Sequence, residues 1–370
     1  MCRPAQPKLR VLYLITDLQQ GGTPGAVQSL ACGLDRQRFE PHVCCLSSAG
    51  PVAEQIQARG VRVTPLSARG TRDIRVFFRL KALIRQFRPD VLHCYLAHAN
   101  FVGRVVGTWC RVPLRLASIR TAEMGARWHL WLERLSWRLG RYVICNSESV
   151  AQHTHRFSRV PISHIRVIPN GIQIDRFTGA TPAGLEELNL DPARKVICFV
   201  GRFDSVKDVG TLIEAFKIVG KVHDAQLLLV GDGPMMAQWR QLAEENSGVG
   251  NGITFVGWRD DVPSLLKVAT IFVLPSRWEG MPNALMEAMA AGCAVVATDV
   301  AGCRDLVTDQ ATGLLVPPGD VPAMAHAIKS LLSDPTRADQ LARQAQAHVA
   351  EHYSLEQHVQ AHQHLYQKVR

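Results

Sequence analysis

Two glutamates separated by seven residues stand out in the stretch RWEGMPNALMEAMAAG, residues 277–292. Glu279 precedes a Met-Pro-Asn turn, and Glu287 follows it among alanines and methionines. Proline suits the first position of a helix and glycine suits its end, so the pattern predicts a helix over residues 282–291 that stops at Gly292. Glu279 is then expected in a loop facing the helix N-terminus, and Glu287 in the second helical turn.

The start of this predicted helix offers a binding site for an oxygen-rich ligand. The backbone N–H groups of Asn283, Ala284 and Leu285 have no acceptor inside such a helix, so they can bind phosphate or sugar oxygens. Glu287 needs hydrogen-bond donors because an unpaired buried charge is costly. The vicinal hydroxyls of a ribose would satisfy it, as would a nearby backbone amide. Glycosidases use carboxylate pairs as acid and base, but here Glu287 is committed to a helix interior.

Two further stretches contain groups that can bind phosphate. GRFDSVKD, residues 201–208, follows a predicted strand and carries Arg202 and Lys207, whose guanidinium and ammonium can bind phosphate oxygens. An ordinary charged surface would look the same. Gly21 and Gly22 lie in DLQQGGTPG, between the first predicted strand and a helix. They would let the backbone approach a ligand, or simply form a tight turn.

The sequence lacks the signatures of several other nucleotide-binding and nucleic-acid-binding proteins. GDGPMM has Met236 where a dinucleotide-binding fingerprint needs a third glycine. An ATP-hydrolysing P-loop is absent, as is an Asp-x-Asp pair for a metal-bound nucleotide sugar. We therefore expect protein groups to neutralise any bound phosphate, with no metal or other cofactor. No DNA- or RNA-binding signature is visible, so nucleic acid is not an expected partner.

The composition and the rhythm of apolar runs predict a two-domain α/β protein. The chain has 370 residues, of which 47% are hydrophobic and 20% charged. Short apolar runs alternate with helical patterns, as in parallel sheets covered on both faces. These runs lie at residues 11–15, 42–46, 61–66, 90–95, 114–119, 142–147, 196–201, 225–231, 253–257, 271–276 and 294–300.

The rhythm is interrupted once, at residues 169–195, which are rich in Pro, Gly, Thr and Asn. We therefore predict two Rossmann-like parallel-sheet domains facing across a cleft, over residues 1–172 and 173–353. Residues 354–370 are expected to form a final amphipathic helix. Ligands of open α/β sheets bind at the carboxyl ends of the strands, so the cleft is the expected site.

Cysteine usage and the N-terminus predict the cellular compartment. The ten cysteines are scattered and form no Cys-x-x-Cys pair, so we expect buried thiols and neither disulfides nor a zinc site. No apolar run reaches the roughly 20 residues needed to span a bilayer. The N-terminus lacks a signal-peptide profile, which predicts a cytoplasmic protein.

The net charge of +10 is unevenly distributed, with much of the excess in residues 72–88 and 127–141. Such a bias indicates an anionic partner, such as phosphate groups or an acidic lipid surface. Residues 127–141 place four apolar side chains near one helical face: Trp128, Trp131, Leu135 and Leu139. This face either contacts an anionic membrane, making the protein peripheral on the inner membrane face, or belongs to a core helix with a charged outer side.

Together these stretches resemble glycosyltransferase family 4, the retaining, metal-independent transferases of GT-B fold. The resemblance spans nearly the whole chain and is strongest over residues 275–307, which are similar to the family's Glu-x7-Glu signature region. GRFDSVKD, LLLVGDGP, FVGWRDDV, VIPNGI and the Gly-Gly turn occur in the family's usual order. Each of these motifs alone is unspecific, whereas the ordered set is specific.

The resemblance implies roles for individual residues. Glu287 would bind the nucleotide ribose, Glu279 would contact the donor sugar, and Arg202 and Lys207 would bind the diphosphate. The other implied donor-binding residues are Gly21, Gly22, Gly201, Val256, Arg259, Gly280, Met281, Pro282, Asn283, Ala284 and Leu285. Among them, Val256 to Arg259 would border the base, and Gly21 and Gly22 would close over the phosphates. The resemblance also implies that the last helix, residues 354–370, returns to the N-terminal domain.

One position departs from the family's pattern. Members often carry a histidine after the fifth strand, where this chain reads SIRTAEMG with Arg120 and Glu123. Either Arg120 supplies the electrostatic role or the acceptor side is modified. His93 and His98, one strand earlier, are candidates, although a lone histidine is more often structural.

The activity implied by the resemblance is transfer of a sugar from a nucleotide diphosphate-sugar, UDP-sugar in particular, to an acceptor hydroxyl with retained anomeric configuration. The implied catalytic residues are Glu279, Arg202, Lys207 and Arg120. Polysaccharide or lipid-linked glycan synthesis would supply the acceptor. Two other functions stay open: a nucleotide-sugar epimerase of the same fold, and a non-catalytic nucleotide-sugar-binding partner protein.

Overall fold

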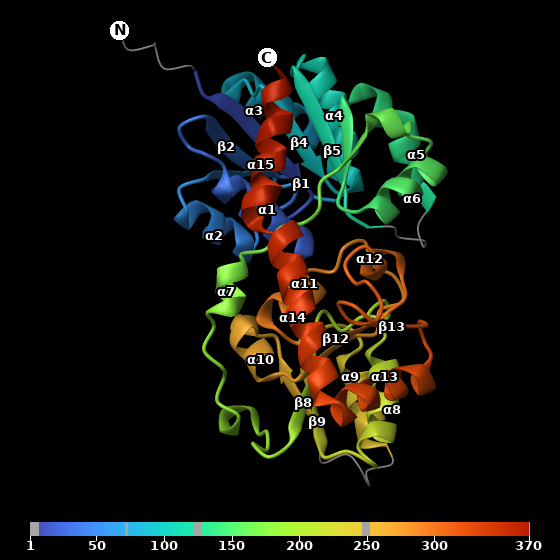
Figure 1. Ribbon diagram of the computed structural model, residues 1–370. Coiled ribbons are helices and arrows are strands. Elements are labelled where there is room, and N and C mark those ends of the chain that lie inside the picture. The colour runs from blue at the N-terminus through green and yellow to red at the C-terminus, as the bar shows by residue number, and fades with distance from the viewer. Residues whose placement is uncertain (1–6, 71–72, 122–126, 246–251, 370) are drawn as a thin grey trace. The chain divides into compact units, whose positions relative to one another are not determined.

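The computed structural model describes residues 7–70, 73–121, 127–245 and 252–369, and this part of the chain forms two compact units (Figure 1). Unit 1 comprises Met1–Gly171 and Leu355–Arg370, and unit 2 comprises Ile172–Ser354. Within the described residues, unit 1 is built on a sheet of seven strands and unit 2 on a sheet of six. The prediction of two Rossmann-like α/β domains is confirmed.

The sheet of unit 1 has the strand order β3-β2-β1-β4-β5-β6-β7, and the neighbouring strands pair in parallel. Its strands are β1 (Leu9–Ile15), β2 (Phe39–Cys45), β3 (Arg62–Pro65), β4 (Val91–Tyr95), β5 (Leu114–Ile119), β6 (Tyr142–Cys145) and β7 (Ile165–Val167). The central strands are mostly apolar and largely buried because helices cover both faces of the sheet. Strand β7 did not appear among the predicted strands, since three residues are too few to form a recognisable apolar run.

Two layers of helices cover the sheet of unit 1. Tyr13 and Ile15 of β1 pack in the cluster that includes α1, α2 and α15, whereas Leu12 and Leu14 pack with α3 and α4 on the other face. The helices are α1 (Gly22–Gly33), α2 (Pro51–Ala58), α3 (Arg75–Phe87), α4 (Ala97–Trp109), α5 (Arg127–Ser136), α6 (Glu148–Ser158) and α15 (Leu355–Tyr366). The C-terminal helix α15 therefore belongs to unit 1, although unit 2 separates it from the rest of that unit in sequence.

A buried ion pair fixes the orientation of α5 on α4. The Arg104 side chain on α4 is almost fully buried, and its Nη2 donates to Oε1 of Glu133 on α5 at 2.5 Å. Its Nη1 donates to Ser136 Oγ at 3.1 Å. Glu133 therefore points inward, and the opposite side of α5 exposes Trp128, Trp131 and Leu135 by 55%, 61% and 60%. The interpretation of this segment as a core helix with a charged outer side is wrong, because Arg104 needs a carboxylate in that position.

The sheet of unit 2 has the strand order β10-β9-β8-β11-β12-β13, again with parallel neighbours. Its strands are β8 (Lys195–Val200), β9 (Ala225–Val230), β10 (Ile253–Gly257), β11 (Ile271–Leu274), β12 (Ala294–Thr298) and β13 (Leu314–Val316). The helices are α7 (Ile174–Thr178), α8 (Val209–Val219), α9 (Met236–Glu244), α10 (Val262–Val268), α11 (Asn283–Ala291), α12 (Ala301–Arg304), α13 (Val321–Ser333) and α14 (Pro335–His352). Strand β13, of three residues, is the second that the apolar runs did not reveal.

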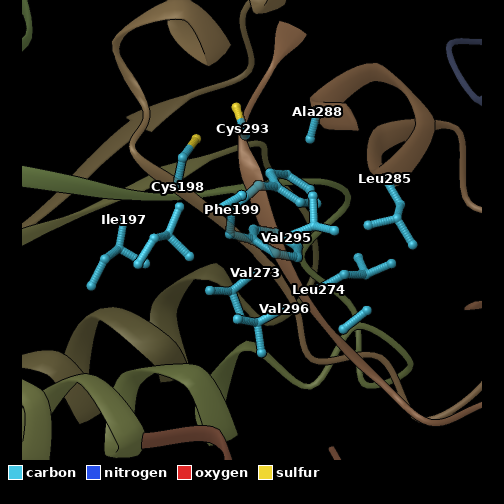
Figure 2. Packing of buried hydrophobic residues seen from close by; sticks show 14 of the residues in the cluster. Ile197, Cys198, Phe199, Val273, Leu274, Leu285, Ala288, Cys293, Val295 and Val296 are labelled. Atoms are coloured by element: carbon cyan, nitrogen blue, oxygen red, sulfur yellow. The ribbon is translucent and has the colours of Figure 1, made fainter. Parts of the chain in front are cut away.

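The core of unit 2 packs α11 tightly on the sheet. Leu285 and Ala288 project from α11 toward the strand residues Phe199, Leu274 and Val295 (Figure 2). Small residues on this face of α11 let the helix backbone lie close to the sheet, which explains the alanine-rich sequence that follows Glu279.

The segment that links unit 1 to unit 2 in sequence also contributes to the core of unit 2. Ile172, Phe177, Leu188 and Leu190 are all buried in the unit 2 cluster. Because these residues are separated by Pro, Gly and Thr, they form no periodic pattern, which is why the sequence suggested only a link.

The described cysteines are all free thiols, and seven of the nine are buried, as predicted. Among the described residues, no helix combines the length and the apolarity required to cross a membrane.

The Arg104–Glu133 pair generates a prediction about stability. Glu133→Leu should lower the free energy of unfolding by about 3–5 kcal/mol, because it leaves a buried guanidinium without a counter-charge. The double variant Arg104→Met/Glu133→Leu should recover most of that loss, since no uncompensated charge remains. Urea unfolding followed by circular dichroism measures both. A double variant as unstable as Glu133→Leu would show that the pair does not control this interface.

Candidate functional site

The strand order of unit 2 indicates where a ligand can bind. The chain runs outward from β8 to β9 and β10, then returns to place β11 on the other side of β8. Two adjacent parallel strands whose connections leave in opposite directions open a crevice at their carboxyl ends. The segments that follow β8 and β11 are GRFDSVKD and the loop containing Glu279. The topology therefore brings the predicted basic and acidic residues of unit 2 to one place.

An ion pair joins these two loops. Lys207 Nζ donates to Glu279 Oε1 at 2.5 Å, and both side chains are largely buried. Ser276 Oγ donates to the same oxygen at 2.6 Å. Among the described residues, the second carboxylate oxygen, Oε2, has no hydrogen-bond partner. Glu279 is thus held by one oxygen, which leaves the other to contact a ligand.

A second set of contacts holds the same loops together. The Arg277 backbone N–H donates to Val206 O at 2.8 Å, and the Arg277 Nε lies 3.2 Å from Asp208 Oδ2. Asp208 has a φ of 45°, in the left-handed region that aspartate tolerates better than most residues. Its carboxylate also accepts from Thr211 Oγ1 at 3.0 Å at the start of α8. The loop conformation that presents Lys207 is therefore specified by Asp208 and Arg277, neither of which was among the predicted site residues.

Arg202 is the most accessible predicted phosphate ligand. Its side chain is 74% exposed, and its contact with Asp204 is long, at 3.9 Å. Asp204 instead accepts from the backbone N–H groups of Val206 and Lys207, which shapes the turn. Gly201 directly follows β8 and lies beside Gly231, whose φ is 136° and where a Cβ would lie 1.8 Å from the Gly201 carbonyl oxygen. Gly231, the first glycine of GDGPMM, therefore allows the two backbone segments to approach closely.

The helix that carries Glu287 begins one residue later than predicted. Pro282 is the N-cap of α11 with an extended ψ of 111°, and its carbonyl accepts the first helical hydrogen bond, from Met286 N at 3.3 Å. Pro282 was expected inside the helix, but its position as the cap leaves Asn283 as the first helical residue. Gly292 has a φ of 85° and ends the helix as predicted. Gly280 and Met281 complete the loop between Glu279 and this helix, with Met281 nearly buried.

Glu287 is a half-buried carboxylate in the second turn of α11. Burial raises the pKa of its carboxyl from 4.5 to about 7, and the positive charge of Arg176 on α7 opposes this rise only in part. Among the described residues, Glu287 has no hydrogen bond or ion pair within the protein. The alternative, in which Glu287 accepts a hydrogen bond from a neighbouring backbone amide, is therefore wrong within the described part of the chain. Ligand hydroxyls would supply the donors that the protein does not.

Sequence reasoning missed a glycine that supports the Glu279 loop. Gly302 lies in α12, and a Cβ there would be 2.7 Å from the Gly280 carbonyl carbon and 2.8 Å from Glu279 O. Buried Thr298 donates its hydroxyl to Ser276 O at 2.5 Å, beneath the same loop. Thr298 and Gly302 are the first and last residues of TDVAG, at the end of β12. The resemblance covers this stretch but assigns no role to either residue.

The predicted base-binding residues lie farther along the sheet. Val256 is a half-buried residue of β10, two strands away from β8. Arg259 is engaged by Asp261 through two hydrogen bonds of 2.8 and 2.6 Å, which raise the pKa of the guanidinium. The structure thus brings together Arg202, Lys207, Glu279 and the start of α11, whereas Arg259 is bonded elsewhere.

The remaining predicted residues belong to unit 1. Gly21 is the N-cap of α1 with extended backbone, and Gly22 is the first helical residue. His93 is fully buried, with Nδ1 2.7 Å from Tyr366 Oη and Nε2 2.8 Å from Ser118 Oγ, so its ring is part of the core. His98 lies in the first turn of α4. Glu123 lies outside the described residues.

Arg120 follows β5 and donates to Asn170 Oδ1 at 2.6 Å. Burial lowers the pKa of its guanidinium, and the interaction with Tyr95 opposes this shift. Burial and the charge of Arg120 both lower the pKa of His358 on α15, to about 4. Arg120 is thus the charged member of a cluster of neutral imidazoles, which is consistent with an electrostatic role at the carboxyl edge of the unit 1 sheet.

Comparison with known proteins identifies the family. The model named Glycosyltransferase Family 4 matches residues 20–176, and that named Glycosyl transferases group 1 matches residues 194–334. The UDP-Gal:alpha-D-GlcNAc-diphosphoundecaprenol alpha-1,3-galactosyltransferase of Escherichia coli is 26% identical over 81% of this chain and 82% of its own length. The N-acetyl-alpha-D-glucosaminyl L-malate synthase of Bacillus anthracis is 30% identical over 80% of this chain and 79% of its own length. The chain belongs to glycosyltransferase family 4.

Solved structures agree on the fold. The crystal structure of Anabaena HepE in complex with UDP superposes with a TM-score of 0.86 at 19% identity, covering 97% of this chain and 100% of that one. The sucrose-phosphate synthase of Thermosynechococcus elongatus has a TM-score of 0.81 at 22% identity, covering 98% and 99%. The protein is a glycosyltransferase of GT-B fold.

The raised pKa of Glu287 predicts how stability depends on pH. The folded state favours the protonated acid, so the contribution of Glu287 to stability is fully present below about pH 4.5 and is lost as the pH rises through about 7. Glu287→Gln should therefore match the parent near pH 4 and exceed it near pH 8, by on the order of 3 kcal/mol. Urea unfolding across this range measures the difference, with exposed Glu186→Gln as the control. Parallel pH profiles for the parent and Glu287→Gln would contradict the assignment.

The backbone contact of Gly302 predicts a local cost for any side chain there. Gly302→Ala should lower the free energy of unfolding by about 1–3 kcal/mol, because its methyl group would push on the Glu279–Gly280 backbone. Gly210→Ala on α8 is the matched control, since a Cβ there would be 3.5 Å from its nearest neighbour. Thermal unfolding compares the two variants. Equal stability would show that the loop moves without cost.

Proposed function

We propose that this glycosyltransferase moves a sugar from a UDP-sugar to an acceptor hydroxyl, with retention of the anomeric configuration and without a metal ion. The observation that carries the proposal is the junction of β8 and β11, where Lys207 bonds Glu279 at 2.5 Å beside the start of α11. The fold is shared with HepE, which has been solved in complex with UDP and with UDP-glucose.

The diphosphate of the donor would be bound by protein charges. Arg202 is exposed and only loosely paired, so its guanidinium can bind two phosphate oxygens. Lys207 has three N–H donors, and Glu279 accepts from only one of them, so the ammonium can bridge the carboxylate and a phosphate. As the bond to the sugar breaks, negative charge grows on the diphosphate, and these two cations with the N-terminus of α11 stabilise it. This is the work that a metal ion performs in other transferases.

Glu279 and Glu287 would hold different parts of the donor. Glu279 presents Oε2 to a sugar hydroxyl while Ser276 and Lys207 fix Oε1, which makes it an orienting group. Glu287 would accept hydrogen bonds from the ribose hydroxyls. Attack by the acceptor from the face that the diphosphate leaves would give retention, and the departing phosphate would take the acceptor's proton.

The acceptor would be selected by unit 1, in which Arg120 is our candidate for the electrostatic role and Gly21 and Gly22 are our candidates for approach to a ligand. The Escherichia coli relative is named for a diphosphoundecaprenol acceptor, which supports a lipid-linked glycan as acceptor here. Such a reaction would take place in the cytoplasm, at the inner face of the membrane.

Thermal unfolding with nucleotides tests the donor site. UDP at about 100 times its dissociation constant should add roughly 2.7 kcal/mol of stability in metal-free buffer, and NAD should add none. Glu287→Gln, though intrinsically more stable near pH 8, should gain less from UDP because the ribose loses a carboxylate acceptor. Lys221→Ala, an exposed residue after α8, is the control that should respond like the parent.

The outcomes separate the alternatives. A response to GDP or ADP in place of UDP would change the donor base and keep the site. Absence of stabilisation by every diphosphate would contradict the proposal. Incubation with a UDP-sugar and analysis of the product by NMR then decides whether the linkage retains the donor configuration.

A further inference from the structure

The exposed large hydrophobic side chains of unit 1 gather on one of its two helical layers. Among the described residues, they all fall between positions 74 and 162. They are Ile74, Phe78, Trp109, Trp128, Trp131, Leu135, Phe157 and Ile162. In the described part of α1, α2 and α15, which cover the opposite face of the sheet, no large hydrophobic side chain is exposed. This asymmetry requires an explanation, because burial normally removes such side chains from water.

The helices that carry these side chains lie on the same face of the sheet. Helices α3 and α4 pack on Leu12 and Leu14, and α5 packs on α4 through Glu133. Helix α6 packs on Val143 and Cys145 of β6, whereas Ile144 between them joins the cluster of the opposite face. Side chains alternate along a strand, so α6 covers the same face as α3 and α4. We call the outer side of α3, α4, α5 and α6 the basic aromatic face; the helices are labelled in Figure 1.

The same segment carries the net charge of the whole chain. Residues 74–164 contain fifteen arginines and lysines against four aspartates and glutamates, an excess of eleven, whereas the entire chain has a net charge of +10. Most of these cations are at the surface. The exposed arginines of the described residues in this segment are Arg75, Arg79, Arg85, Arg88, Arg111, Arg134, Arg138, Arg141, Arg156 and Arg159.

Apolar and cationic side chains are interleaved at the junction of α3 and α4. Phe78 is 60% exposed and lies with its ring centroid 6.4 Å from that of Trp109, which is 54% exposed. Lys81 Nζ lies 3.7 Å from the centroid of the Trp109 ring, so its charge is held over the aromatic surface. Arg75 and Arg85 flank Phe78 on α3, a helix without an acidic residue. Arg134 on α5 and Arg138 just after it accompany the exposed Trp128 and Trp131 in the same way.

We propose that the basic aromatic face binds the surface of an anionic lipid bilayer. Tryptophan and phenylalanine rings enter the boundary between headgroups and acyl chains, while arginine and lysine remain with anionic headgroups. The excess of cations therefore provides the electrostatic attraction to the membrane, and the aromatic rings insert below the headgroups. This inference rests on the proposed function in one respect. The bound membrane would supply the lipid-linked acceptor.

Co-sedimentation with vesicles tests the proposal. The protein should bind vesicles of equal parts phosphatidylglycerol and phosphatidylcholine at low salt, bind more weakly as salt increases, and not bind pure phosphatidylcholine. Phe78→Ser/Trp109→Ser and Trp128→Ser/Trp131→Ser should each weaken binding at least about tenfold, as should Arg75→Glu/Arg85→Glu. All six residues are at the surface, so the variants should fold.

Matched controls lie on unit 2. Ile218→Ser/Val222→Ser removes two exposed apolar side chains, and Lys221→Glu/Arg343→Glu changes the net charge by the same amount as Arg75→Glu/Arg85→Glu. Both should bind vesicles like the parent. Failure of the parent to bind anionic vesicles would overturn the proposal, as would equal losses in test and control variants. Stabilisation by UDP is measured on every variant and should be unchanged; its absence in the parent would contradict the donor site and leave vesicle binding as a separate result.

Discussion

The candidate donor site depends on one topological constraint, the adjacency of β8 and β11. Their connections leave in opposite directions, so the loops after them face each other without a helix in between. The ion pair of Lys207 with Glu279 and the contacts of Arg277 with Asp208 and Val206 then hold the two loops in register. Because α11 begins directly after the second loop, the same constraint determines where its N-terminus and Glu287 lie.

Unit 1 shows a comparable dependence on a single buried charge. Arg104 lies inside the α4–α5 interface and requires a carboxylate, which only Glu133 supplies among the residues of α5. With Glu133 turned inward, the periodicity of the helix places Trp128, Trp131 and Leu135 on the outside. The exposed tryptophans are therefore a consequence of the inner ion pair, and one polar contact in the core decides the chemistry of the surface.

The sequence was sufficient for the parts of the fold that are long and regular. Apolar runs located the central strands, and Gly292 located the end of α11, because a positive φ is a property of one residue. Strands β7 and β13 have three residues each and carry no periodicity. The inward position of Glu133 depends on Arg104, which lies twenty-nine residues earlier in the chain, and no local pattern encodes that contact.

The candidate site was predictable by residue type and less so by geometry. Charge and spacing identified Glu279, Glu287, Arg202 and Lys207, but the bond between Lys207 and Glu279 joins positions 72 residues apart. Ser276, Thr298 and Asp208 act through single oxygen atoms whose direction follows from tertiary packing. Gly302 and Gly231 act by lacking a side chain, and a sequence alone does not distinguish such a glycine from one in an ordinary turn.

Helix α15 gives the molecule an order of assembly. Tyr366 on this helix lies against Tyr13 and hydrogen-bonds His93, so part of the largely apolar face of the first sheet stays uncovered until the helix arrives. During synthesis the chain of unit 2 emerges in full before α15, and it has all of its own strands available by then. The unit begun first on the ribosome is thus finished last. Unit 1 therefore exposes this apolar patch for as long as unit 2 is being translated, and an exposed patch of that kind favours aggregation during the interval.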